Sequence, residues 1–255
     1  MELQIERFLE GKTALITGGS RGIGRELANI FSKAGADIII NYQNRAEEAE
    51  KTKRLVEDNG CKALVFKADV SDNTQVKEMI NKSLAELGKI DILINNAGFS
   101  QPKFFLDISE NEWDKMISVH LKGAYNCCQH ILPHMIERQQ GKIINMSSVI
   151  GKSGGPWAGT HYATVKAGLI GMTKSLANQL AKYHINVNCV APAMIITEIS
   201  SWRTSEQLRA HTEMIALKRT GTTLESAYAT LYLASPYADY ITGYTMDIGG
   251  GMYMD

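Results

Sequence analysis

Residues 12–35 constrain the fold of this chain more than any other segment, because they read as a strand, a glycine-rich turn and a helix in direct succession. Residues 12–17 form a short apolar run, as in a strand that is buried on both faces of a sheet. Gly18, Gly22 and Gly24 follow at once. Apolar residues at helical spacing then continue to Gly35, which is a typical stop signal for a helix.

The glycine-rich turn has the features of a phosphate-binding site. Glycine has no Cβ, so the backbone can turn sharply and approach an anion closely. The first N–H groups of the following helix and the positive end of its dipole point toward such an anion. The spacing G-x3-G-x-G differs from the commoner G-x-G-x-x-G fingerprint but has the same parts in the same order. An ordinary glycine-rich turn between a strand and a helix is the alternative.

Strands and helices alternate along the rest of the chain. Short apolar runs predict strands, and longer segments with helical spacing separate them, including 110–138 and 160–183. Right-handed crossovers between parallel strands place helices on both faces of a sheet. We therefore predict an α/β fold, a Rossmann-type doubly wound parallel sheet of about seven strands, in a single domain over residues 1–255. The predicted strands are 12–17, 36–41, 61–68, 90–95, 142–147, 186–190 and 245–248.

Composition narrows the classes of partner. Lys plus Arg equals Asp plus Glu at 27 each, so no overall field favours nucleic acid or an anionic membrane. No apolar run approaches the length of a membrane span, and the first residues are too charged to open a secretory signal. The four cysteines have neither C-x-x-C spacing nor histidine partners at zinc-ligand distances. We expect free thiols, no metal site and a cytoplasmic location.

The residues directly after the predicted strands are the candidates for a binding site. Ligands of doubly wound sheets bind beyond the carboxyl ends of the strands, where the strand order reverses. These positions carry glycine or polar residues in place of apolar filler. They are 18–24, 42–45, 69–70, 95–98, 147–148 and 192–197.

Ser148, Tyr162 and Lys166 form a candidate catalytic group. Tyr162 and Lys166 are four positions apart in a helical pattern, so their side chains share one face of the helix. A phenol loses its proton near pH ~10, and a neighbouring ammonium favours the phenolate and lowers that pKa. Such a tyrosine can exchange a proton with an alcohol oxygen, and Ser148 can hold the same oxygen by a hydrogen bond. An exposed Tyr–Lys contact on a helix is the alternative.

Taken together, these segments resemble the short-chain dehydrogenase/reductase family. The motifs that carry the resemblance are Thr17-Gly18-Gly19-Ser20-Arg21-Gly22-Ile23-Gly24, Asp69-Val70, Asn95-Asn96-Ala97-Gly98, Ser148, Tyr162-x3-Lys166 and Asn188-Cys189-Val190-Ala191-Pro192. The resemblance extends from about Gly11 to the end of the chain. Within the family, residues 162–176 and 250–254 look most like bacterial 3-oxoacyl-[acyl-carrier-protein] reductases.

The resemblance implies hydride transfer between a nicotinamide cofactor and a small carbonyl or alcohol substrate. Tyr162 would be the proton donor or acceptor, Lys166 would bind the nicotinamide ribose and lower the pKa of Tyr162, and Ser148 would hold the substrate carbonyl. Together with the residues at the end of the second predicted strand, the candidate cofactor-binding residues are Gly18, Ser20, Arg21, Ile23, Gly24, Asn41, Tyr42, Arg45, Asp69, Val70, Asn95, Ala97, Gly98, Tyr162, Lys166, Pro192, Ile195 and Thr197.

The end of the second predicted strand bears on the choice between NADP(H) and NAD(H). A carboxylate there would accept hydrogen bonds from a free ribose 2′-hydroxyl and repel a 2′-phosphate. Asn41, Tyr42 and Gln43 occupy this place, with no carboxylate. Arg21 and Arg45 could pair with a 2′-phosphate, since arginine suits bidentate contacts. We expect NADP(H) as the cofactor. The alternative is that Arg45 is simply the residue at which a surface helix begins.

Several positions depart from the family pattern, and the departures at Ala193 and Gly249 are mild. His120 stands where the family usually has an asparagine that takes part in a proton relay; a histidine can replace it as a relay member or simply pack at a helix bend. Gln139 and Tyr183 occupy places where the carrier-protein reductases tend to have arginines, so a carrier-bound substrate stays an open question.

Three hypotheses about function remain: a carbonyl reductase, a sugar or polyol dehydrogenase, and a nucleotide-binding protein with little turnover. Residues 193–218 read either as a lid over the site or as a plain pair of surface helices. Trp157 and Trp202 hint at an apolar pocket, although aromatic residues also serve simple packing. The resemblance further implies a homo-oligomer, a dimer or tetramer, paired through residues 110–138 and 160–183.

Overall fold

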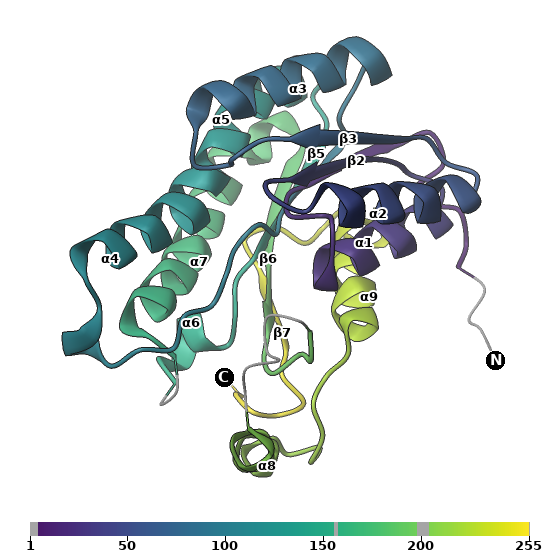
Figure 1. The fold of residues 1–255 in the computed structure, drawn as a ribbon. Helices are drawn as coiled ribbons and strands as arrows, with labels where there is room; N and C mark the ends of the chain where they lie inside the picture. The colour runs from purple at the N-terminus through teal and green to yellow at the C-terminus, as the bar shows by residue number, and fades with distance from the viewer. Residues whose placement is uncertain (1–4, 156–157, 198–203, 255) are drawn as a thin grey trace.

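A single parallel sheet of seven strands runs through the molecule in the order β3-β2-β1-β4-β5-β6-β7 (Figure 1). The structure is a computed structural model and describes residues 5–155, 158–197 and 204–254. The strands are β1 Thr13–Ile16, β2 Asp37–Tyr42, β3 Ala63–Lys67, β4 Ile92–Asn95, β5 Gly141–Met146, β6 Ile185–Pro192 and β7 Thr245–Ile248. The strand order reverses between β1 and β4, so the predicted doubly wound sheet is confirmed.

Helices cover both faces of the sheet (Figure 1). One face carries α1 Gly22–Lys33, α2 Ala46–Asp58 and α9 Thr223–Ala234. The other carries α3 Asn73–Leu87, α5 Gly123–Glu137 and α7 Thr160–Leu180. The remaining helical segments are α4 Glu110–Ile117, α6 Ile150–Ser153, α8 Ser205–Met214 and the short turns η1 Phe105–Asp107, η2 Ser118–Lys122, η3 Ala181–Tyr183 and η5 Pro236–Ala238. No helix in the described ranges is long and apolar enough to cross a membrane.

Alternation along the strands divides the core into two layers. Ala14 and Ile16 of β1 face the α1 side, whereas Leu15 between them faces the α5 side. Successive side chains of a strand point to opposite faces, so apolar residues at every position are what a sheet covered on both sides requires. All four cysteines are buried and free, as expected from their spacing.

The predicted helical segment 110–138 is helical almost throughout, but it is interrupted at His120. A π-helical turn, η2, separates α4 from α5, and in it the N–H of Gly123 bonds to the carbonyl of Ser118. A π turn holds an extra residue, and such turns are frequent at functional sites. Here the wide turn presents the buried His120 toward the end of β4.

Candidate active site

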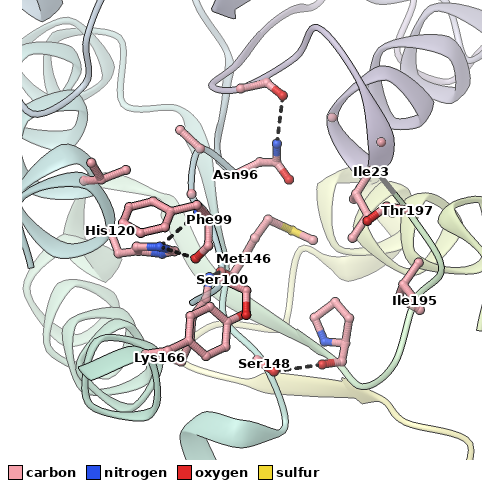
Figure 2. Close-up of a pocket in the computed structure, with 18 of the residues that line it drawn as sticks. Ile23, Asn96, Phe99, Ser100, His120, Met146, Ser148, Lys166, Ile195 and Thr197 are labelled. Atoms are coloured by element: carbon pink, nitrogen blue, oxygen red, sulfur yellow. Dashed lines mark hydrogen bonds between the residues drawn. The ribbon is translucent and has the colours of Figure 1, made fainter. Parts of the chain in front are cut away.

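A cavity of about 680 Å³ opens at the carboxyl ends of the strands. Its walls come from the segments that follow β1, β2, β3, β4, β5 and β6, together with α7, α8 and the C-terminal tail. In Figure 2, Phe99 and His120 form one wall, Ile195 and Thr197 lie opposite beside Ile23, and Ser148 and Lys166 lie between the two walls. The structure thus brings together segments that are far apart in the sequence.

The glycine turn after β1 is held by side-chain amides. The N–H of Gly18, which has a φ of 63°, donates to Asn41 Oδ1 at 3.2 Å, and Asn96 Nδ2 donates to the Gly18 carbonyl at 3.2 Å. Gly24 must be glycine, because an added Cβ would lie 2.2 Å from the Gly18 carbonyl oxygen. The first turn of α1 therefore packs directly on the end of β1.

This turn fits the diphosphate of a dinucleotide. Gly18, Ser20, Arg21 and Gly24 line the cavity, and α1 begins there with no acidic residue in its first turn and no hydrogen bond from a capping side chain. The first N–H groups of such a helix, with the positive end of its dipole, favour an anion. Asp69 and Val70 line the same cavity after β3, as do Ala97 and Gly98 after β4.

Ser148, Tyr162 and Lys166 meet in this cavity. Ser148 follows β5, and its hydroxyl donates to the Pro192 carbonyl at 3.2 Å. Tyr162 and Lys166 lie one turn apart on α7, with Lys166 Nζ 5.5 Å from the centroid of the Tyr162 ring. Lys166 is buried and donates to the Met146 carbonyl at 2.5 Å. Burial lowers the pKa of Lys166 to about 8.

His120 lies against the ring of Tyr162. The two rings meet edge to face with centroids 5.7 Å apart. His120 is 3% exposed, and its Nε2 lies 3.0 Å from the carbonyl oxygen and 3.1 Å from the nitrogen of Phe99. An added Cβ on Gly98 would lie 2.3 Å from His120 Cε1, so the glycine makes room for the imidazole.

The His120 imidazole is neutral near pH 7. Burial and the positive charge of Lys166 hold the pKa of His120 well below its usual value of 6.5. Its Nδ1 is buried and has no hydrogen-bond partner within the described part of the chain. A neutral ring with a free nitrogen can both accept and donate a proton.

Two of the predicted cofactor-binding residues are not among those that line the cavity. Tyr42 packs against the apolar layer on the α1 side. The amide of Asn95 is buried inside the sheet, where Nδ2 donates to Asn145 Oδ1 at 2.8 Å. Asn41 does line the cavity, but its amide is engaged with Gly18 and with the Ala68 carbonyl. Asn41 therefore has a structural role, because its amide holds the glycine turn after β1.

The other predicted residues, Ile23, Arg45, Pro192, Ile195 and Thr197, line the cavity. Among the further lining residues, Phe99 and Ser100 lie in residues 99–107 and Met194 and His211 lie in residues 193–218, two segments that the sequence indicates as shaping the pocket, whereas Lys115 and Met252 were missed. His211 comes from α8, which lies apart from both helical layers at the bottom of Figure 1, so the sequence alone could not show that its side chain reaches the cavity.

Residues 193–218 contain the helix α8, which brings His211 to the cavity wall. Trp157 and Trp202, which hinted at an apolar pocket, lie outside the described residues.

Comparisons with known proteins agree with this geometry. A family model described as "Enoyl-(Acyl carrier protein) reductase" matches residues 18–253. The chain is 40% identical over 243 residues to the 3-oxoacyl-[acyl-carrier-protein] reductase FabG of Staphylococcus aureus (strain Mu50), covering 95% of this chain and 98% of the relative. It is 37% identical over 245 residues to the enzyme of the same name from Chlamydia muridarum, covering 96% and 98%.

Solved structures give the same result. The crystal structure of a 3-oxoacyl-[acyl-carrier protein] reductase from Brucella melitensis aligns with a TM-score of 0.92 at 32% identity, covering 100% of this chain and 99% of that one. A second structure from Brucella melitensis, with bound NAD, aligns with a TM-score of 0.91 at the same identity and the same coverage. Because the family model spans most of the chain and its relatives match it nearly end to end, the chain belongs to the short-chain dehydrogenase/reductase family, whose members are NAD(P)-dependent oxidoreductases.

Proposed function

We propose that this protein reduces a ketone, a 3-oxoacyl thioester or a similar carbonyl compound, to a secondary alcohol with NADPH. The observation that carries the proposal is that Ser148, Tyr162 and Lys166 line the same cavity as the glycine turn. The FabG relatives, which are named as 3-oxoacyl reductases, match 95% of the chain and support this choice of substrate class.

Each residue of the group has a separate task. When bound, NADPH supplies the hydride that is added to the carbonyl carbon. The Tyr162 hydroxyl donates a proton to the carbonyl oxygen, which completes the alcohol. Ser148 donates a hydrogen bond to the same oxygen and fixes its position. The Lys166 ammonium, 5.5 Å from the ring centroid of Tyr162, stabilises the phenolate that remains.

His120 is proposed to take part in returning a proton to Tyr162. Its ring touches that of Tyr162, and the charge of Lys166 affects its pKa, so it lies within electrostatic reach of both groups. A neutral imidazole can accept a proton at one nitrogen and release one from the other without a lasting charge.

The proposed cofactor is NADP(H) rather than NAD(H). Arg21 and Arg45 line the cavity, and Arg45 immediately precedes α2. Gln43 and Asn44, which also line it, follow β2 in place of the carboxylate that would select NAD. A 2′-phosphate would therefore meet the guanidinium groups of Arg21 and Arg45.

The lining of the substrate side favours an acyl ketone over a sugar. Phe99, Ile150, Ala158, Met194 and Met252 present apolar side chains to the cavity. A polyol would leave hydroxyl groups unpaired against such walls, at a cost in free energy for each one.

We further propose a homo-oligomer that works in the cytoplasm. The free cysteines suit a reducing compartment. Exposed aromatic side chains, Tyr125 on α5 and Tyr240 and Tyr244 beside β7, are the kind of surface that a second copy would cover.

The test is NADPH oxidation against a panel of acetoacetyl thioesters, free and carrier-bound, with diketones, cyclic ketones and sugars. We expect thioesters to react fastest. A preference for oxidising polyols with NADP⁺ would instead assign a polyol dehydrogenase. Stoichiometric NADPH binding without turnover of any ketone would assign a binding protein.

Cofactor choice is tested with the double variant Arg21→Ala/Arg45→Ala. We expect its KM for NADPH to rise about tenfold or more, while its KM for NADH changes little, since only NADPH carries the 2′-phosphate. Arg54→Ala, an exposed arginine on α2, is the matched control. Equal changes for the two cofactors would remove the argument for NADP(H).

A further inference from the structure

His161, a buried histidine directly before Tyr162, belongs to none of the roles described above. Its side chain is 0% exposed, and it lies in the first turn of α7. A buried histidine must place both ring nitrogens, because an unpaired polar atom in the interior costs free energy. The contacts of the two nitrogens therefore indicate what the residue does.

The backbone of Tyr162 determines the state of this imidazole. The N–H of Tyr162 is shared between two acceptors, the Gly159 carbonyl at 2.9 Å and His161 Nδ1 at 3.0 Å. Since Nδ1 accepts a hydrogen bond, the proton of the neutral ring is on Nε2. That Nε2 is buried and has no hydrogen-bond partner among the residues that the structure describes.

Packing restricts the position of the His161 ring as well as hydrogen bonding does. An added Cβ on Gly159 would lie 2.3 Å from His161 Cε1, 2.6 Å from Nδ1 and 2.7 Å from the Gln101 carbonyl oxygen. The imidazole therefore fills space that exists only because residue 159 is glycine. It is held between the start of α7 and the segment that follows β4.

Tyr162 is thus contacted from two sides. His161 accepts its backbone N–H, and His120 packs edge to face against its ring at 5.7 Å. His120 is bonded to Phe99, and Gly159, whose open space the His161 ring fills, lies against the Gln101 carbonyl, so both histidines lie beside the segment after β4.

We propose that His161 is a positioning residue for Tyr162. By accepting the Tyr162 N–H and filling the space over Gly159, it sets the start of α7 and so the place of the phenol relative to Ser148 and Lys166. The proposal rests on the proposed role of Tyr162 as proton donor. A small displacement of such a group can cost about a hundredfold in rate, so positioning of this kind is measurable.

The first test compares two substitutions of His161. Asparagine has an oxygen near the place of Nδ1 and can accept the Tyr162 N–H, whereas leucine fills similar space without an acceptor. We expect His161→Leu to lower kcat about tenfold or more with KM for NADPH unchanged, and His161→Asn to stay near the wild-type rate. His184→Asn, an exposed histidine with a φ of 56°, is the matched control.

A second variant moves the imidazole without altering it. Gly159→Ala would place a methyl group 2.3 Å from His161 Cε1, and its φ of −63° suits alanine. We expect it to lower kcat as His161→Leu does. Gly171→Ala, on the same helix with nothing within 4 Å of its added Cβ, is the control and should leave kcat unchanged.

A third measurement needs no substrate. The titration of the Tyr162 phenol is read from the ultraviolet absorbance of tyrosinate, as the difference between each protein and its Tyr162→Phe counterpart. The ionisable groups that face this phenol are Lys166 on α7 and His120 on η2. Displacing the phenol from the Lys166 ammonium should move its titration midpoint to higher pH in His161→Leu and Gly159→Ala, and not in His161→Asn.

The outcomes separate this proposal from the proposed function. Wild-type kcat and an unshifted phenol midpoint in His161→Leu would overturn it. Equal losses of kcat in His161→Leu and His161→Asn, with the midpoint unshifted, would also overturn it, because packing alone would then explain the loss. If the midpoint shifts while the wild-type protein reduces no ketone, the positioning role stands and the proposed function fails.

Discussion

The two ends of the parallel sheet differ in how fully their buried polar groups are paired. At the amino end, the buried carboxylate of Asp91 accepts a hydrogen bond from the N–H of Thr13 at 2.9 Å and pairs with Arg138 at 2.7 Å and Lys89 at 3.9 Å. At the carboxyl end, Lys166 is buried with a lowered pKa, and His120 and His161 each keep a buried nitrogen without a partner in the described ranges.

This difference separates stability from activity. Charges at the amino end are neutralised by their own neighbours, so they contribute to folding and leave nothing for a ligand. Groups at the carboxyl end are less well satisfied within the protein, and they line or adjoin the cavity. Substitutions at the carboxyl end should therefore lower kcat, whereas substitutions at the amino end should lower the free energy of unfolding.

The largest expected effect is at the carboxyl end, in Tyr162→Phe. This change removes only the hydroxyl that donates the proton, so kcat should fall about a thousandfold or more. The ring contact with His120 at 5.7 Å is kept, so NADPH binding and the unfolding midpoint should stay near wild type. Steady-state kinetics and a thermal melt check both. Retention of more than about a tenth of the wild-type kcat would show that another group supplies the proton.

The amino end should give the opposite result in Asp91→Ala. Removing the buried carboxylate leaves the Thr13 N–H without its acceptor and the partly exposed Arg138 without its counter-ion, so the free energy of unfolding should fall by about 2 kcal/mol, roughly thirtyfold in the unfolding constant. The kcat of the folded protein should not change. Denaturant unfolding and kinetics on one preparation test this. Glu10→Ala, which breaks the exposed pair with Arg7, should leave the unfolding midpoint in place. A loss of kcat in Asp91→Ala would contradict the separation.

A smaller effect is expected from pH at Lys166. Its pKa is lowered to about 8, so it is an ammonium below that pH and a neutral amine above it. If the ammonium binds the nicotinamide ribose, the affinity for NADPH is highest below pH about 8 and falls by up to about tenfold per unit above it. Fluorescence titration of NADPH across this range measures the change. Lys166→Met should bind weakly and with no such slope, and a flat profile in the wild-type protein would exclude the ribose contact.

His120→Asn should have the smallest effect. The pKa of His120 is held well below 6.5, so the wild-type pH–rate profile should show no inflection from it near neutral pH. Loss of a relay member should slow kcat severalfold and alter the profile, because Tyr162 must then regain its proton without the imidazole. An unchanged profile would count against a relay and leave His120 as a packing partner of Gly98 and Tyr162.

Much of the fold and of the cofactor side followed from the sequence alone, because backbone requirements are visible there. Gly24 has no room for a Cβ, and Gly18 has a positive φ, so glycine at both positions is a physical necessity that a motif can report. The apolar runs likewise predicted all the strands of the sheet, because each is covered on both faces.

Other features depend on geometry that the sequence pattern does not carry. Asn95 and Ala97 are two residues apart in one motif, yet the amide of Asn95 turns into the sheet while Ala97 lines the cavity. Helical spacing continues through Ser118–Lys122, so the π turn could not be seen. His211 reaches the cavity from a helix outside the sheet, and no spacing rule predicts that approach.

Because of the π turn at Ser118–Lys122, the number of residues between α4 and α5 cannot change without moving the two helices. Deleting a single residue there would let α4 and α5 join as one regular helix, but each residue of an α-helix turns the chain by about 100°. The helix α4 would then rotate relative to α7, and the His120 ring would no longer lie over Gly98. Loop grafts and chimeras between relatives in this region therefore have to preserve the residue count from α4 to α5 before they preserve any side chain.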